Sequence, residues 1–260
     1  MLNKINGFIF IILLVFFATG NASGKSLENS ALKEEVRELL RNNPEIILDI
    51  LRENDVLLFD MMGKAAAKKQ NLAEQQRIQA EMRNPFKPKI EKGRPVRGNP
   101  NAPITIIAYD DFQCPYCAMA AKTLDQIMEK YKGKVRLILK HNPLDFHKQA
   151  FPAALYFEAI AKQDKQKAWK FHDLVFSQQA SLVDGEKTLK KFAASLGVDT
   201  KRLESDLKNP AIKSIVERDM NEAKKFGFRG TPTFLINGVS LRGAASEEKF
   251  SEIIRLFLKS

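Results

Sequence analysis

Cysteine is scarce in this 260-residue chain, which contains only Cys114 and Cys117. The two lie three positions apart, so a disulfide between them closes a very short loop and removes little conformational entropy from the unfolded chain. A chain of this length also buries enough apolar surface to fold without cross-links. The pair is therefore poorly placed for a structural role, and a chemical role is expected.

Histidine is scarce as well, and this limits the metal chemistry that the chain can perform. A structural zinc site needs four ligands, and the chain has no third cysteine and no histidine pair at ligand spacing. We therefore expect no zinc and no bound cofactor. A copper(I) site made by the two thiolates remains an alternative, because soft sulfur ligands suit that ion. The three histidines are expected to be surface or core residues: His141, His147 and His172.

The chain also lacks an arginine-rich tract, an internal repeat and a low-complexity segment. Its formal net charge is +11, but the lysines are spread along the chain and mixed with acidic residues. Nucleic-acid binding proteins concentrate their basic residues on one face or motif. The composition thus favours a solvated basic surface and excludes nucleic acid as the expected partner, while 44% hydrophobic residues are typical of a globular protein.

Residues 1–22 have the pattern of a secretory signal peptide. Lys4 precedes an apolar run at residues 8–18, and Gly20 and Ala22 form a small-residue cleavage pattern. The apolar run is too short to span a bilayer comfortably, although an uncleaved anchor is the alternative. No cysteine stands near the cleavage point to carry a lipid. We therefore expect export to the periplasm, with cleavage after Ala22.

Residues 27–83 have helical periodicity and no strand pattern. Asn43 followed by Pro44 is typical of a helix cap and a first helical position. Apolar stripes without a sheet to cover them need a partner, so we expect this extension to form a homo-oligomer. Residues 84–100 contain four prolines and two glycines among charges, which predicts a stiff connector to a domain at residues 101–260.

The next segment predicts a strand–helix–strand unit. A buried strand is expected at residues 104–109, a helix from Cys114 to about residue 131, and a second strand at residues 135–139. Such a unit has parallel strands joined by a right-handed crossover. Helical periodicity then continues from residue 146 to about residue 226.

Strand patterns return near the end of the chain. Residues 231–236 and 239–243 flank Asn237-Gly238, which is the strongest short signal for a hairpin. An amphipathic helix at residues 247–258 closes the sequence. The predicted fold class is α/β, with an inserted helical region and an all-helical extension in front.

The position of the two cysteines at a helix start gives them a chemistry. Cys114 is predicted to cap the helix, with Pro115 at the first helical position, where its missing N–H costs nothing. Free backbone N–H groups and the helix dipole lower the pKa of a thiol there. Cys117 lies one turn further, within disulfide range. Cys114 can therefore attack and Cys117 can resolve in thiol–disulfide exchange.

These motifs resemble those of the DsbA-type thioredoxin-fold disulfide oxidoreductases. The resemblance runs from Gly98 to Ser260 and implies a thioredoxin fold with an inserted helical domain. It also implies that Pro232 is cis and abuts the dithiol, and that Thr231 presents backbone groups to a substrate peptide. The matching stretches are NPNAPITI, FQCPYC, KAWKFHDLVF and GFRGTPTFLINGVSLRGA.

Two positions depart from the family pattern. Relatives often carry a buried acid where this chain has Ala108; Asp110 or Asp111 either replaces it or forms part of a turn. The strongest oxidants of the family have a histidine between the cysteines, whereas this chain has Pro115 and Tyr116. The missing histidine predicts a less oxidising couple.

The extension resembles the oligomerising segments of some DsbA-like isomerases and copper-stress proteins. The resemblance implies an exported enzyme that forms, reduces or isomerises disulfides, with isomerase activity favoured if the extension assembles. Its expected partners are cysteine-containing exported proteins and a membrane redox protein that resets the dithiol.

Overall fold

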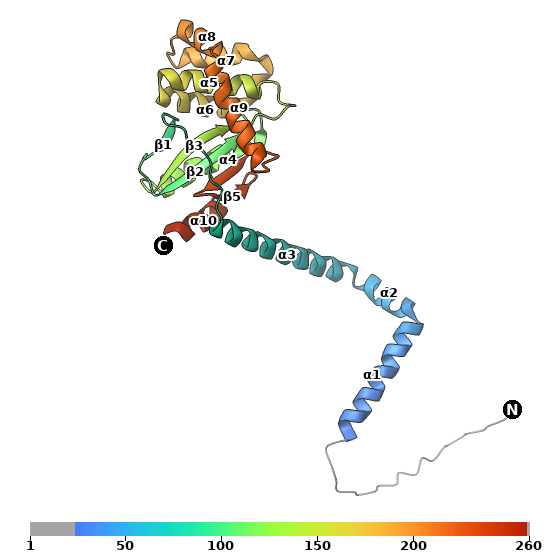
Figure 1. The fold of residues 1–260 in the computed structure, drawn as a ribbon. Coiled ribbons are helices and arrows are strands. Elements are labelled where there is room, and N and C mark those ends of the chain that lie inside the picture. The colour runs from blue at the N-terminus through green and yellow to red at the C-terminus, as the bar shows by residue number, and fades with distance from the viewer. Residues whose placement is uncertain (1–23, 259–260) are drawn as a thin grey trace, which may run out of the picture. The chain divides into compact units, whose positions relative to one another are not determined.

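A computed structural model describes residues 24–258 (Figure 1). The chain divides into two compact units, with the boundary between Gln70 and Asn71. The signal peptide expected at residues 1–22 lies outside the described residues. None of the helices described for residues 24–258 combines the length and apolar character needed to cross a bilayer.

Helices make up the described part of the first unit. They are α1 (Gly24–Asn42), α2 (Pro44–Glu53) and the beginning of α3 (Asp55–Arg83). Pro44 opens α2 as predicted, but the Asn43 side chain does not cap that helix. Its amide Nδ2 instead donates to the carbonyl oxygen of Leu39, 2.8 Å away at the end of α1.

The second unit is built on a five-stranded sheet with the order β1-β3-β2-β4-β5. β2 and β3 are parallel and joined by α4, whereas the other pairings are antiparallel. The predicted strand–helix–strand unit and hairpin are confirmed. Asn237 and Gly238 both have positive φ, as a tight hairpin turn requires. The strands are β1 (Val96–Gly98), β2 (Ile104–Asp110), β3 (Val135–His141), β4 (Thr233–Ile236) and β5 (Val239–Arg242).

Helices inserted between β3 and β4 form the predicted helical region, and α10 (Glu247–Leu258) closes the chain (Figure 1). The arrangement is the expected α/β class. The inserted elements are α5 (Ala150–Gln163), α6 (Lys165–Ser177), the 3-10 helix η1 (Gln179–Asp184), α7 (Glu186–Ser195), α8 (Thr200–Leu207) and α9 (Pro210–Lys225).

Residues 84–100 are more than the connector that the sequence predicted. They contribute β1, which pairs with β3, and the guanidinium of Arg94 is buried against the carboxylate of Asp219. The prolines, glycines and charged residues of this segment give no strand pattern in the sequence. An edge strand of only three residues can form without such a pattern, so it was not predicted. The segment is therefore part of the folded unit.

The end of α3 also belongs to the second unit, although the sequence assigned it to the extension. The backbone N–H of Ser240 on β5 donates to the carboxylate of Glu81, and Arg77 donates to the carbonyl oxygen of Ser240. Ile78 on the same helix is buried. These contacts cover an edge strand whose N–H and C=O groups would otherwise lack partners.

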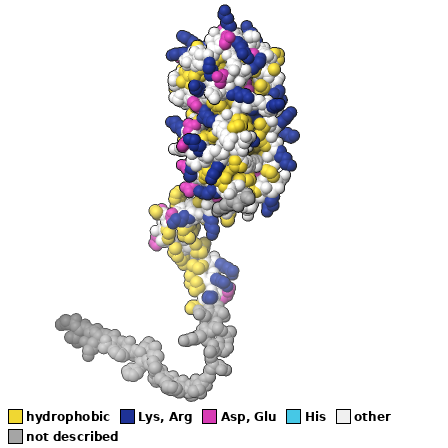
Figure 2. All heavy atoms as spheres, turned by 90° about the vertical axis from the view of Figure 1, so that its left-hand side faces the viewer, with side chains coloured by type: hydrophobic (Ala, Val, Ile, Leu, Met, Phe, Trp, Pro, Cys, Tyr) yellow, Lys and Arg dark blue, Asp and Glu magenta, His cyan; other side chains and the backbone are white. Residues whose placement is uncertain are grey.

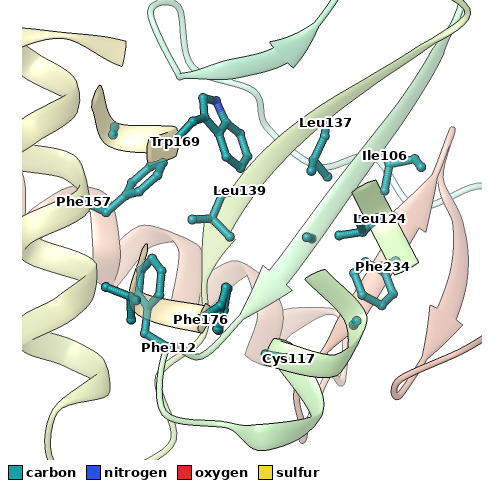
Figure 3. Packing of buried hydrophobic residues seen from close by; sticks show 14 of the residues in the cluster. Ile106, Phe112, Cys117, Leu124, Leu137, Leu139, Phe157, Trp169, Phe176 and Phe234 are labelled. Atoms are coloured by element: carbon teal, nitrogen blue, oxygen red, sulfur yellow. The ribbon is translucent and has the colours of Figure 1, made fainter. Parts of the chain in front are cut away.

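The second unit contains two clusters of buried apolar side chains, and both cysteines belong to the larger cluster. Figure 3 shows part of it, with Cys117 in the same cluster as Leu124 and Phe176. Trp169 on α6 lies at its margin, where the guanidinium of Arg97 stacks 4.5 Å from the ring centre. The smaller cluster contains Ile107, Tyr109, Ile138, Ala223, Phe228 and Leu235.

Candidate active site

The dithiol lies where β2 ends and α4 (Pro115–Lys130) begins. Cys114 has an extended backbone at the N-cap and Pro115 follows at the first helical position, as the sequence predicted. Both cysteines are free thiols and both are buried, with 4% of Cys114 and none of Cys117 exposed. α4 forms because Cys117, Ala120, Leu124 and Ile127 recur at helical spacing and bury one face.

The two thiols differ strongly in acidity. A hydrogen bond from Cys117, helped by backbone N–H groups of the first helical turn, lowers the pKa of Cys114 to about 5. Burial raises the pKa of Cys117 far above its ordinary value. At neutral pH the site therefore holds a thiolate at Cys114 and a protonated thiol at Cys117.

A loop from the far end of the chain closes over the first sulfur. The Thr231-Pro232 peptide bond is cis, as the resemblance implied. The carbonyl oxygen of Thr231 lies 3.3 Å from Sγ of Cys114. The loop is fixed by a hydrogen bond from the N–H of Gly243 to the carbonyl oxygen of Pro232, 2.9 Å long. The sequence thus correctly predicted that these distant motifs meet.

Asp110 and Asp111 occupy different environments, which separates the two readings that the sequence left open. Burial raises the pKa of Asp110 to about 7, an effect that a hydrogen bond with Cys117 partly offsets. Its Oδ1 has no hydrogen-bond partner among the described residues. Side chains alternate along a strand, so Asp110 shares a face of β2 with Ala108. Asp110 is therefore the buried acid near Cys117.

Asp111, by contrast, holds the loop together. Its carboxylate accepts the backbone N–H groups of Gln113 and Leu144 at 2.7 and 2.8 Å, and that of Cys114 at 3.2 Å. Nδ1 of His147 lies 2.8 Å from the same carboxylate. These contacts make Asp111 a turn residue that positions the dithiol.

Gln179 is a residue that sequence reasoning missed. It lies on η1 in the inserted helices, and its Nε2 donates to the carbonyl oxygens of Phe112 and Cys114, 2.9 Å each. This amide ties the helical insertion to the loop that carries the dithiol. No local pattern marks such a residue, because its partners lie more than 60 positions away in sequence.

The surface beside the dithiol is apolar and open. Tyr116 and Met119 lie one turn apart on α4, and 60% and 59% of them are exposed. Within residues 24–258, no group of three or more histidine, cysteine, aspartate or glutamate side chains could hold a metal ion.

Comparison with curated proteins reveals a partial relationship to much longer chains. A Na⁺/H⁺ antiporter NhaA of Herminiimonas arsenicoxydans is 36% identical over 160 residues, which is 62% of this chain and 24% of the antiporter. This chain therefore spans about a quarter of that relative's length. The match says nothing about ion transport by this chain.

Solved structures resemble the chain over most of its length. BdbD from Bacillus subtilis, in its oxidised form, is 28% identical with a TM-score of 0.59, covering 68% of this chain and 98% of BdbD. ScsC from Proteus mirabilis, in a transitional conformation, is 21% identical with a TM-score of 0.58, covering 88% and 98%. The second likeness shows the fold alone. The fold is thus a thioredoxin fold with DsbA-like neighbours.

The family model described as thioredoxin matches residues 91–255, from the segment before β1 into α10. The matched range contains the whole sheet, the dithiol and the cis-proline loop. Because this match covers more than half of the chain and agrees with its fold, the chain is a member of the thioredoxin family.

Proposed function

We propose that the chain is a thiol–disulfide oxidoreductase that acts on exported proteins in the periplasm, with Cys114 as the nucleophile and Cys117 as the resolving thiol. The observation that carries this proposal is the opposite displacement of the two thiol pKa values beside the Thr231-Pro232 loop. A thiolate is the species that attacks a disulfide.

The first step is attack by the Cys114 thiolate on one sulfur of a substrate disulfide. The substrate S–S bond breaks, a mixed disulfide forms, and the second substrate sulfur leaves and takes up a proton. Cys117 then loses its proton and attacks Sγ of Cys114. This releases the first substrate sulfur as a thiol, so the substrate is reduced and the enzyme dithiol is oxidised. The reverse sequence forms a disulfide in the substrate.

Asp110 is the group suited to take the proton from Cys117. A base works best when its pKa lies near the working pH, and the pKa of Asp110 is about 7. Its unpartnered Oδ1 leaves it free to accept a proton. Asp110 therefore assists resolution of the mixed disulfide.

Thr231 and Pro232 are proposed to hold the substrate. An extended peptide that pairs with the backbone of Thr231 would lie against the loop by strand addition, with its cysteine next to Cys114. The short separation between the Thr231 carbonyl oxygen and Sγ of Cys114 supports this role. Pro115 and Tyr116 would adjust the reactivity of the site, since they separate the two cysteines.

Among the possible redox activities, we favour disulfide isomerisation, because the first unit exposes apolar side chains that association with other copies of the chain would bury. Figure 2 shows hydrophobic side chains on the helices next to the grey residues. We infer that the extension at residues 27–83 associates with copies of itself through the part that lies in the first unit, which ends at Gln70, and gathers several dithiols around one substrate. The exposed apolar side chains of the first unit include Leu32, Val36, Leu39, Ile46, Ile47, Ile50, Leu51, Val56, Leu57, Phe59, Met61 and Met62.

The test compares two activities of the full-length protein. Reactivation of scrambled ribonuclease reports isomerisation, and oxidation of reduced ribonuclease reports disulfide formation. Isomerase function predicts faster reactivation than that produced by a small-molecule thiol alone. Rapid oxidation without reactivation would contradict it, and inactivity of the wild type in both assays would overturn the redox function. Cys114→Ser is the inactive control.

A membrane redox protein would reset the dithiol in the cell.

Copper(I) binding is less well supported by the site. Sulfur ligands bind metal as thiolates, and burial raises the pKa of Cys117, so copper(I) would have to displace the Cys117 proton in order to bind both sulfurs.

A further inference from the structure

A hollow of about 580 Å³ adjoins the cis-proline loop. It is lined by residues 227–233, which lead into β4, and by Arg242 and Gly243 at the end of β5. Thr231 belongs to this lining, and its carbonyl oxygen lies 3.3 Å from Sγ of Cys114. The hollow therefore begins beside the atom that captures the substrate.

The ionisable side chains that line this hollow are both basic. They are Arg229 and Arg242, and no aspartate or glutamate lies among its lining residues in the described part of the chain. Both arginines are exposed, and neither guanidinium forms a hydrogen bond or ion pair with any residue from 24 to 258. Elsewhere in the same unit, Arg94 and Arg97 bind carboxylates. The two charges at the hollow are thus available to a ligand.

The backbone holds these two arginines beside the loop. Arg242 is directly opposite Thr233 in the β4–β5 pairing, and the neighbouring Gly243 donates its N–H to Pro232. Arg229 stands two residues before Thr231. The pair of charges is therefore positioned by the same segments that would hold a substrate peptide.

We propose that Arg229 and Arg242 select substrate segments that carry an acidic residue close to the cysteine being captured. This proposal rests on the thiol–disulfide exchange function proposed above and deepens it. A guanidinium offers a fork of donors that matches a carboxylate. A peptide extended along the loop advances about 3.4 Å per residue, so side chains within about three positions of its cysteine reach the hollow.

The test uses full-length reduced protein and peptides whose single cysteine is a disulfide with 2-thiopyridine. The Cys114 thiolate attacks the peptide sulfur, the mixed disulfide forms, and 2-thiopyridine leaves with the electron pair and takes a proton. Cys117 then displaces the peptide as a thiol. The peptides are compared in sets of three. Within a set, the residues at one to three positions from the cysteine, on one side of it, are glutamate, glutamine or lysine, and the rest of the peptide is the same. One set varies the residues before the cysteine and a second set varies those after it.

With the wild type, we expect the second-order rate constant for 2-thiopyridine release in this single turnover to be about three- to tenfold higher for the glutamate peptide than for the lysine peptide. This ratio should fall as salt screens exposed charges. Arg229→Gln with Arg242→Gln should bring the ratio close to one, and Arg229→Glu with Arg242→Glu should invert it. Arg255→Glu is the matched control, because Arg255 is an arginine outside this lining and should leave the ratio unchanged.

The outcomes separate this inference from the function on which it rests. If the wild type releases no 2-thiopyridine from any peptide, the exchange function itself is wrong. If the three peptides of each set react at equal rates, the function stands and the acidic preference is wrong. If the arginine variants change only the reaction with oxidised glutathione, a small disulfide that carries carboxylates, the assignment to acidic peptide segments is also wrong.

Discussion

Neighbouring residues of the same type have opposite properties at this site. Cys114 is acidic and Cys117 is not, while the pKa of Asp110 is raised to about 7 and Asp111 accepts several hydrogen bonds. Burial and hydrogen bonding produce these differences. The sequence predicted the roles of the cysteines from their place at a helix start, but it left the two aspartates undivided because their burial depends on packing.

The acidity of Cys114 leads to the first prediction. The rate of its alkylation should rise with pH through a midpoint of about 5. Cys117→Ala should move this midpoint upward because the main hydrogen bond to the thiolate is lost, and Cys117→Ser should move it less. The measurement is mass-resolved iodoacetamide labelling across pH. A midpoint near 9 in the wild type would show that the thiolate is not stabilised.

The same shift makes the stability of the reduced fold pH-dependent. The pKa of Cys114 is lower in the fold than in the unfolded chain, so its stabilisation is fully present above about pH 9 and is lost as pH falls through about 5. The oxidised fold has no such thiolate. As pH falls from about 9 through about 5, the free energy of unfolding of the reduced form should therefore decline relative to that of the oxidised form. Urea titrations of both forms at several pH values measure this difference.

The contribution of Asp110 to stability depends on pH in the opposite direction. Its pKa is raised in the fold, so its contribution is present below about pH 4 and is lost as pH rises through 7. Asp110→Asn should raise the free energy of unfolding at pH 8 by on the order of 2 kcal/mol. It should also prolong the mixed disulfide at least tenfold because Cys117 loses its proton acceptor.

Urea unfolding at pH 5 and pH 8 and quenched mixed-disulfide lifetimes measure these two effects. Asp111→Ala is the matched control, and it should destabilise the fold by about 3 kcal/mol at both pH values because several N–H groups lose their acceptor. Equal mixed-disulfide lifetimes in the wild type and Asp110→Asn would exclude Asp110 as the acceptor.

Among the secondary-structure elements, those with strong periodicity were predicted well. β2 and β3 are apolar runs, the β4–β5 hairpin has an Asn-Gly turn, and α4 has a proline at its start. β1 was missed because its three residues form a strand only against β3. The hydrogen bond from Gln179 to the carbonyl oxygen of Phe112 could not be predicted from the sequence either, because only tertiary packing brings these two residues together.

The end of α3 gives a prediction about truncation. A protein that starts at residue 71 keeps Ile78, Arg77 and Glu81 on β5, whereas one that starts at residue 84 loses them. We expect the shorter fragment to be less stable by about 3 kcal/mol, from one lost apolar side chain and the uncovered edge strand. Urea midpoints of the two fragments measure this, with Glu81→Gln as an intermediate. Equal midpoints would place the boundary at residue 84.

At the scale of the whole molecule, exposed apolar side chains distinguish the first unit from the second. A monomer rarely leaves so many such side chains open to water. On the visible surface of the second unit, Figure 2 shows Lys and Arg side chains spread among smaller groups of hydrophobic side chains. The proposed assembly would bury the apolar set.

Solution mass provides the corresponding prediction. The chain without residues 1–22 should have a multiple of its monomer mass by light scattering, whereas the fragment from residue 71 should be monomeric. Ile47→Asp with Ile50→Asp should lower the mass of the longer protein, because both side chains are exposed on α2 and burying a charge is costly. Lys64→Asp is the polar control and should keep the assembly. Monomeric mass for every protein would refute the idea.

The stacking of Arg97 on Trp169 has a practical consequence, because Trp169 is the single tryptophan of the chain. All indole fluorescence therefore arises at one point, where a helix of the insertion meets the first edge strand. Its emission should shift to the red when those two parts separate and should be insensitive to association of the N-terminal helices. The protein thus carries its own optical reporter for the docking of its inserted helices onto its sheet.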